Sequence, residues 1–107
     1  GSLAILRKLA KAGNMNMVGI PKTIDNDVAY TETSIGYDTA VQVAVEAMDR
    51  LQPTAASHNR IMILEVMGRD AGHIALSAGI AGGADVILIP EQPYKLQKIK
   101  EKVENIR

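Results

Sequence analysis

Seven residues of the chain, Pro21 to Asp27, contain side chains that could carry out acid–base and phosphate chemistry. Asp25 and Asp27 supply carboxylates and Lys22 supplies a cation, all within one turn after a short apolar run. Carboxylates in such a turn can act as a general base, bind Mg²⁺ directly or through water, or cap a turn or a helix. The lysine and the hydroxyl of Thr23 favour a site at which a phosphate lies near a hydroxyl that loses its proton.

A second candidate segment, Met67 to Gly72, has the sequence MGRDAG. Glycines between a strand and a helix N-terminus allow backbone N–H groups to approach an anion closely. Arg69 adds a rigid set of donors for phosphate oxygens. The alternative is a plain turn with an exposed arginine. The segment matches neither the G-x-G-x-x-G dinucleotide fingerprint nor a Walker loop.

The spacing of apolar residues predicts the elements that position these segments. Helices are predicted over residues 3–12, 37–51, 96–106 and the stretch between Gly72 and Gly82, and buried strands over residues 17–20, 61–67 and 85–89. A polar loop over residues 52–59, with Pro53 near its start, is predicted to follow the second helix. The order α-β-α-β-α-β-α is typical of an α/β fold with a parallel sheet and right-handed crossovers.

In such a sheet, ligands bind beyond the carboxyl ends of the strands. Residues 21–27, 68–72 and 91–94 each follow a predicted strand directly, so we expect all three to lie at one edge of the sheet. Arg60 begins a strand and is expected at the opposite edge, where it could reach only a neighbouring subunit's site or solvent. His58 and His73 lack metal-ligand spacing and are predicted to be structural.

The composition excludes several classes of function. The chain has 12 basic and 12 acidic residues, so it lacks the basic excess of a general nucleic-acid binder. It has no cysteine, which excludes disulfides, a thiol nucleophile and thiolate zinc sites and fits a reducing, cytoplasmic location. No apolar run approaches the ~20 residues of a membrane span, and no signal peptide is visible at the start. We therefore expect neither a nucleic-acid partner nor a membrane partner.

Three stretches together resemble the phosphofructokinase family: GIPKTIDNDV, the SHNR of residues 57–60, and EVMGRDAG. The resemblance continues through AGGADVILIPE and so covers nearly all of the chain. It implies a glycolytic kinase that phosphorylates the 1-hydroxyl of fructose 6-phosphate, using Mg²⁺ and either ATP or pyrophosphate. It also implies a fragment of the two-domain phosphofructokinase fold, in which residues 1–36 end the donor-binding half and residues 37–107 begin the sugar-phosphate-binding half.

The resemblance implies roles for the residues around the first turn. Asp25 is similar to the base that receives the proton of the sugar hydroxyl. Thr23 and Ile24 correspond to residues that line the fructose phosphate site. Asp27 corresponds to a carboxylate that supports the metal and its water shell, so no direct metal ligand is expected in this chain.

Residues of the second segment are similar to the part of the family's site that grips the sugar phosphate. The matching residues are Met67, Gly68 and Arg69, and Arg69 would also stabilise charge on the transferring phosphoryl group. Arg60 corresponds to an arginine that family members lend to the adjacent subunit's substrate. The resemblance therefore implies a homo-oligomer, in agreement with the expected place of Arg60 at the opposite sheet edge.

The chain departs from the family pattern at positions that concern the donor and regulation. Many ATP-using bacterial members have glycine where this chain has Lys22; lysine is similar to the pyrophosphate-dependent branch, although some ATP users also carry it. Gly1-Ser2, if native, would end the family's GGDGS-like motif and favour ATP; a cloning remnant would carry no such information. Gln52 lies where allosteric members have an effector-binding arginine, and residues 83–85 fall in another part of that site, which leaves nucleotide regulation open.

Family members are much longer than this chain. The resemblance therefore implies an internal fragment without kinase activity of its own, because the donor-binding glycine motifs would precede it. Two alternatives stay open: a non-catalytic α/β folding unit or engineered piece that keeps family residues, and a different phosphosugar-binding module. In a three-stranded fragment, exposed sheet edges and apolar helix faces predict self-association.

Overall fold

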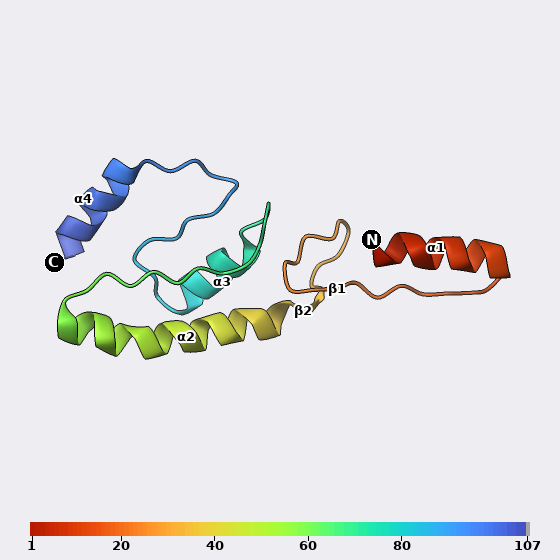
Figure 1. Ribbon diagram of the computed structural model, residues 1–107, viewed down its shortest axis with the longest axis horizontal. Helices are drawn as coiled ribbons and strands as arrows, with labels where there is room; N and C mark the ends of the chain where they lie inside the picture. The colour runs from red at the N-terminus through yellow and green to blue at the C-terminus, as the bar shows by residue number, and fades with distance from the viewer. Residues whose placement is uncertain (107) are drawn as a thin grey trace.

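The computed structural model describes residues 1–106, which contain four helices and a small parallel sheet (Figure 1). The elements follow in the order α1 (Ser2–Gly13), β1 (Lys22–Thr23), β2 (Ile35–Gly36), α2 (Tyr37–His58), α3 (His73–Ala81) and α4 (Leu96–Ile106). The chain is elongated, with extents of 64, 27 and 16 Å and a radius of gyration of 18.7 Å. A compact domain of this length would have a radius of gyration of about 13 Å, so much of the chain lies outside a common core.

Helices α1 and α4 form the two ends of the molecule and confirm the helices predicted there (Figure 1). α1 ends at Asn14, which adopts the left-handed conformation with φ 44° and donates its N–H to the carbonyl of Ala10. Neither helix contains a buried residue. Their apolar stripes are only partly covered: Leu9 and Leu96 are exposed, whereas Leu6 and Ile99 are half-buried. None of the helices within residues 1–106 has the length and hydropathy needed to cross a membrane.

Helix α2 is longer than predicted. The predicted helix over residues 37–51 and the predicted loop over residues 52–59 are wrong at this boundary: the helix continues through Pro53 to His58. An internal proline removes one backbone hydrogen bond, but the next turn can still form, and the alanines that follow are strong helix formers. The helix ends where Asn59 takes the left-handed conformation, with φ 48°.

The apolar core of the described residues lies between α2 and α3 (Figure 1). Its buried side chains are Ala44, Ile74 and Ala78. Half-buried residues packed around them are Tyr37, Ala40, Val41, Val45 and Val66. Glycine allows the chain after α3 to pack closely, because a Cβ on Gly79 would lie 2.7 Å from the side chain of Ile87. This small core fixes the start of α3 and the turn that precedes it.

The three strands predicted from apolar runs do not form in this chain. Residues 17–20, 61–67 and 85–89 are not assigned as strands, and within residues 1–106 none pairs with a neighbouring strand. The carbonyl of Ile89 accepts only the N–H of Gln92, three residues further on, which closes a local turn. A strand is stabilised by hydrogen bonds to a neighbouring strand, and here the neighbours are missing. The segments are also less buried than predicted: Val18 is 90 % exposed and Ile63 is 87 % exposed. The predicted order of three strands is therefore not confirmed.

The sheet that forms consists of β1 and β2. The two strands are parallel, with Lys22 opposite Ile35 and Thr23 opposite Gly36. β1 lies after the apolar run of residues 17–20, within the first candidate segment, and not in the run itself. β2 leads directly into α2. The sheet thus anchors both ends of the loop that contains the first candidate segment.

Candidate functional site

The loop between β1 and β2 is organised by Ser34, a buried polar residue that is 2 % exposed. Its hydroxyl donates to the carbonyl of Thr23 at 2.9 Å and lies 3.2 Å from Oδ1 of Asn26. The N–H of Ser34 donates to the same Asn26 oxygen at 2.9 Å. The amide nitrogen of Asn26 donates to the carbonyl of Glu32 at 3.3 Å. Both ends of the Asn26 amide are thus used within the loop, so this residue holds the loop in shape.

Asp25 lies in this loop with part of its hydrogen-bonding capacity unused. Its N–H donates to the hydroxyl oxygen of Thr23 at 3.2 Å. Its carboxylate oxygen Oδ1 is buried and has no hydrogen-bond partner within residues 1–106. A buried acceptor without a partner costs about 1–3 kcal/mol, and more when it is charged. Such an oxygen is available to accept a hydrogen bond or a proton from a bound ligand.

Three other side chains of the first segment are open to solvent. Lys22, Ile24 and Asp27 are exposed. Within residues 1–106, no group of three or more histidine, cysteine or acidic side chains gathers in a way that could hold a metal ion. Asp27 could contact Mg²⁺ only with waters and ligand oxygens completing the coordination, which is the usual way in which Mg²⁺ binds beside phosphates.

The second segment forms a turn directly before α3. The N–H of Ala71 donates to the carbonyl of Gly68 at 2.8 Å, and Arg69 takes the left-handed conformation with φ 49°. The side chain of Arg69 is 90 % exposed, and its Nε lies 3.8 Å from a carboxylate oxygen of Asp70. An exposed ion pair of this kind holds a side chain only weakly. The backbone of the turn therefore fixes where the side chain of Arg69 begins, while the guanidinium itself is held only weakly.

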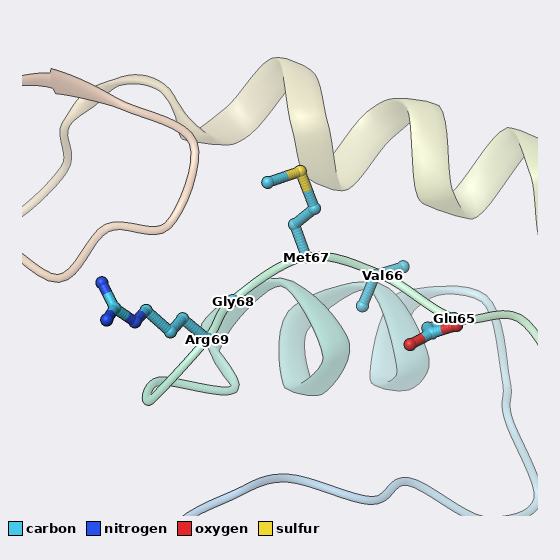
Figure 2. Close-up of a pocket in the computed structure, with 5 residues that line it drawn as sticks. All are labelled: Glu65, Val66, Met67, Gly68 and Arg69. Atoms are coloured by element: carbon cyan, nitrogen blue, oxygen red, sulfur yellow. The ribbon is translucent and has the colours of Figure 1, made fainter.

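Figure 2 shows the depression lined by Glu65 to Arg69. In this view the guanidinium of Arg69 extends away from α3, toward the side on which the loop between β1 and β2 lies. Figure 1 shows that loop at the same end of the α2–α3 pair as the turn. Within residues 1–106, no hydrogen bond or ion pair joins the two segments. They face the same region without contacting one another through such bonds.

Glu91 joins the third polar segment to the turn. Its Oε1 accepts a hydrogen bond from the N–H of Gly72 at 2.7 Å, so Glu91 contacts the end of the turn. The common sheet edge expected for residues 21–27, 68–72 and 91–94 is not confirmed, because residues 61–67 and 85–89 form no strand. This hydrogen bond is the largest cause that lowers the pKa of the Glu91 carboxyl, with further lowering from its own backbone N–H and from His73. Gly72 has no room for a side chain, because a Cβ there would lie 2.5 Å from the side chain of Ile89.

Arg60 is exposed and directly follows the end of α2. The 22 residues of α2, Tyr37–His58, separate it from the loop between β1 and β2. At 1.5 Å per residue this helix is about 33 Å long. Arg60 therefore lies far from Asp25 within its own chain.

The remaining predicted positions make contacts within the fold. The side chain of Gln52 donates to the carbonyl of Gly82 at 2.8 Å and so connects α2 to the end of α3. His58 lies at the end of α2, with Nδ1 2.9 Å from the hydroxyl oxygen of Ser57. The backbone carbonyl of His73 accepts a hydrogen bond from the hydroxyl of Tyr37 at 3.2 Å, although the side chain of His73 is exposed.

Ser34 is the residue of this site that sequence reasoning missed. Its hydroxyl partners lie 8 and 11 residues away along the chain. No helical or strand periodicity links residues at such separations. A serine that follows Thr31-Glu32-Thr33 in a polar stretch gives no local sign that it is buried.

The profile of the phosphofructokinase family matches residues 1–107. ATP-dependent 6-phosphofructokinase 1 of Synechocystis sp. is 70 % identical over 103 residues, covering 96 % of this chain and 28 % of that protein. The protein of the same name from Nostoc sp. is 73 % identical over 99 residues, covering 92 % of this chain and 28 % of that protein. ATP-dependent 6-phosphofructokinase of Chloroflexus aurantiacus is 59 % identical over 103 residues, covering 96 % of this chain and 29 % of that protein.

A solved structure, that of Pichia pastoris phosphofructokinase in the T-state, matches with a TM-score of 0.76 at 34 % identity, over 91 % of this chain and 11 % of that chain. The fold of this chain is therefore similar to part of a phosphofructokinase's α/β fold. The chain spans about 28 % of the length of the Synechocystis and Nostoc relatives. On the match along its whole length, this chain belongs to the phosphofructokinase family.

Proposed function

We propose that this chain forms part of the active site of an ATP-dependent 6-phosphofructokinase, which transfers the γ-phosphoryl group of ATP to the 1-hydroxyl of fructose 6-phosphate. The names of the cyanobacterial and Chloroflexus relatives support this activity. Within the chain, the observation that carries the proposal is the buried, partnerless Oδ1 of Asp25. Phosphorylation of a sugar hydroxyl requires a nearby group that accepts its proton.

In the proposed reaction, Asp25 accepts the proton of the 1-hydroxyl while the hydroxyl oxygen forms a bond to the γ-phosphorus of ATP. The bond between that phosphorus and the oxygen bridging to the β-phosphate breaks, and ADP leaves with the electron pair. Lys22 and Arg69 supply positive charge near the transferring group. A well-placed donor of this kind typically contributes about 3–4 kcal/mol to transition-state stabilisation.

The turn before α3 is proposed to bind the sugar phosphate through Met67, Gly68 and Arg69, while Thr23 and Ile24 line the sugar. The exposure of Arg69 and the direction of its guanidinium support this role (Figure 2). Arg60 is proposed to reach the substrate of a neighbouring subunit in a homo-oligomer. Its place beyond the far end of α2 supports a role outside its own chain's site.

Mg²⁺ is proposed to accompany ATP, with Asp27 contacting it through water. The exposed carboxylate of Asp27 fits that arrangement, because Mg²⁺ retains several waters and takes few protein ligands. When bound, Mg²⁺ would neutralise phosphate charge. The division into a donor-binding half (1–36) and a sugar-phosphate half (37–107) and the cytoplasmic location belong to the same proposal.

Pyrophosphate is the second candidate donor, and the lysine at position 22 favours it. The printed names of the relatives, however, favour ATP.

Substrate binding is tested by calorimetric titration of the chain with fructose 6-phosphate. Arg69→Ala is expected to abolish the heat of binding, whereas Arg50→Ala, which removes an exposed arginine of α2, is expected to leave it unchanged. An equal loss of the heat of binding in both variants, or no loss in either, would count against the turn as the site that binds the sugar phosphate. If the folded chain binds nothing, binding requires parts of the site that lie outside this chain.

Phosphoryl transfer is tested in a chimeric enzyme, in which this chain replaces the matching segment of the Synechocystis relative. We expect this chimera to form fructose 1,6-bisphosphate with ATP and to do so much more slowly with pyrophosphate. We expect the isolated chain to have no kinase activity. A folded but inactive chimera would favour the non-catalytic alternative, and faster turnover with pyrophosphate would overturn the choice of donor.

A further inference from the structure

The turn that presents Arg69 has few contacts of its own. Within it, one backbone hydrogen bond joins Ala71 to Gly68. Arg69 adopts the left-handed conformation, which costs a non-glycine residue roughly 1–2 kcal/mol. The contact between Arg69 and Asp70 is exposed at both ends and therefore weak. Something outside the turn must help to hold it.

Glu91 supplies that contact from the segment after the third apolar run. Its carboxylate accepts the N–H of Gly72, the residue that caps the N-terminus of α3. The N-cap residue of α3 is a glycine, so it has no side chain that could cap the helix. Backbone N–H groups at a helix start lack partners within the helix, and a carboxylate there is favoured by the helix dipole. The bond ties the end of the turn to residues 19 positions further along the chain.

The backbone around this bond leaves little freedom for Gly72. A Cβ at that position would lie 2.5 Å from Ile89 and 3.1 Å from the second carboxylate oxygen of Glu91. The turn therefore ends against the segment that carries Glu91. If the carboxylate is removed, the N–H of Gly72 loses its partner. The C-terminal end of the turn is then no longer bonded to the segment that carries Glu91.

We propose that Glu91 is a positioning residue for the sugar phosphate: through the N–H of Gly72 it holds the turn in the form that directs Arg69 to the substrate. Glu91 does not contact the substrate itself in this account. The inference rests on the proposed function, because it assigns Glu91 to the same sugar-phosphate site.

The first test measures amide exchange at Gly72 in the isolated chain. Exchange is expected to become about tenfold faster in Glu91→Ala and to change less in Glu91→Gln, whose amide oxygen can still accept the bond. Glu101→Ala is the matched control, because Glu101 is an exposed acid on α4. Unchanged exchange at Gly72 in Glu91→Ala, or equally fast exchange in Glu101→Ala, would show that the Glu91 carboxylate does not hold the turn.

The second test uses steady-state kinetics of the chimera. Glu91→Ala is expected to raise KM for fructose 6-phosphate about tenfold, with kcat and the KM for ATP within about twofold of the parent chimera. Glu91→Gln is expected to restore much of the loss. An unchanged KM for fructose 6-phosphate, or an equal loss in every parameter as from general misfolding, would overturn the positioning role.

The two tests separate this inference from the proposed function. If the parent chimera itself is inactive, the proposed function fails. Amide exchange at Gly72 alone then decides whether Glu91 holds the turn. Suppose that the parent chimera is active and that the Glu91 variants show the same KM for fructose 6-phosphate and the same amide exchange as the parent. The proposed function then stands and the inference fails.

Discussion

Replacing Ser34 by alanine would remove the buried hydroxyl that closes the loop between β1 and β2. The hydroxyl makes a bond of ordinary length to the Thr23 carbonyl, 2.9 Å, and a longer one to Asn26, 3.2 Å. A neutral hydrogen bond contributes about 1 kcal/mol net, and a buried acceptor left without its donor adds to the loss. We therefore expect the closed loop to lose about 1–2 kcal/mol, which corresponds to about 5- to 30-fold more frequent opening.

Amide hydrogen exchange of residues 24–35 measures this opening directly. Ligand affinity is a less sensitive readout, because a loop that remains mostly closed binds almost as before. Asn26 has a left-handed backbone, with φ 53°. Asn26→Gly is expected to loosen the loop in the same way, since glycine tolerates this backbone but offers no side-chain acceptor. Asn26→Asp keeps the acceptor oxygen and is expected to loosen it less. Ser57→Ala, at an exposed position on α2, is the control.

Unchanged exchange in this loop in a folded Ser34→Ala protein would contradict the prediction. The same acceleration in Ser57→Ala would also contradict it. In either case the hydroxyl of Ser34 would not be what keeps the loop closed.

Four further results are expected. Pro53→Ala should raise the free energy of unfolding by up to about 3 kcal/mol, because Pro53 lies inside α2; an unchanged denaturant midpoint would contradict the continuous helix. Asp25→Ala should reduce kcat of the chimera at least about a hundredfold without lowering the thermal midpoint, since it removes a partnerless buried oxygen; a lowered midpoint would contradict this. The pKa of Glu91 is lowered in the folded state, so its contribution to stability should be complete above the ordinary glutamate value of about 4.3 and be lost as the pH falls through the lower folded-state pKa. Comparing the urea midpoints of the parent and Glu91→Gln across this range checks the sign, and a difference that grows in acid would be inconsistent with it. The isolated chain should self-associate through exposed apolar residues such as Val18, and light scattering from a clean monomer at high concentration would argue against this.

The helices could be predicted from the sequence because their hydrogen bonds and apolar stripes connect residues three and four positions apart. Three of the four predicted helices agree with the structure at both ends within about two residues, which is the usual variation of helix boundaries. The fourth, α2, was predicted to stop before Pro53. A proline weakens a helix locally, and whether the helix resumes depends on contacts elsewhere, such as the bond from Gln52 to Gly82.

The strands could not be predicted in this way. An apolar run becomes a strand only when another strand lies beside it, and residues 61–67 have no such neighbour within the described chain. The apolar pattern therefore marks a segment suited to a buried sheet, while the pairing depends on partners distant in sequence. The short pair of β1 and β2 formed instead where two chain segments meet around the loop.

For the site, the sequence by itself determined which side chains are available: the carboxylate of Asp25, the cation of Lys22 and the guanidinium of Arg69, in motifs similar to those of phosphofructokinases. Only the tertiary structure decided which of the neighbouring residues hold them in place. Asn26 and Ser34 bond across the loop, and Glu91 reaches Gly72. These bonds join residues 8 and 19 positions apart, and their value depends on burial and on the direction of single N–H groups, which no local sequence pattern encodes.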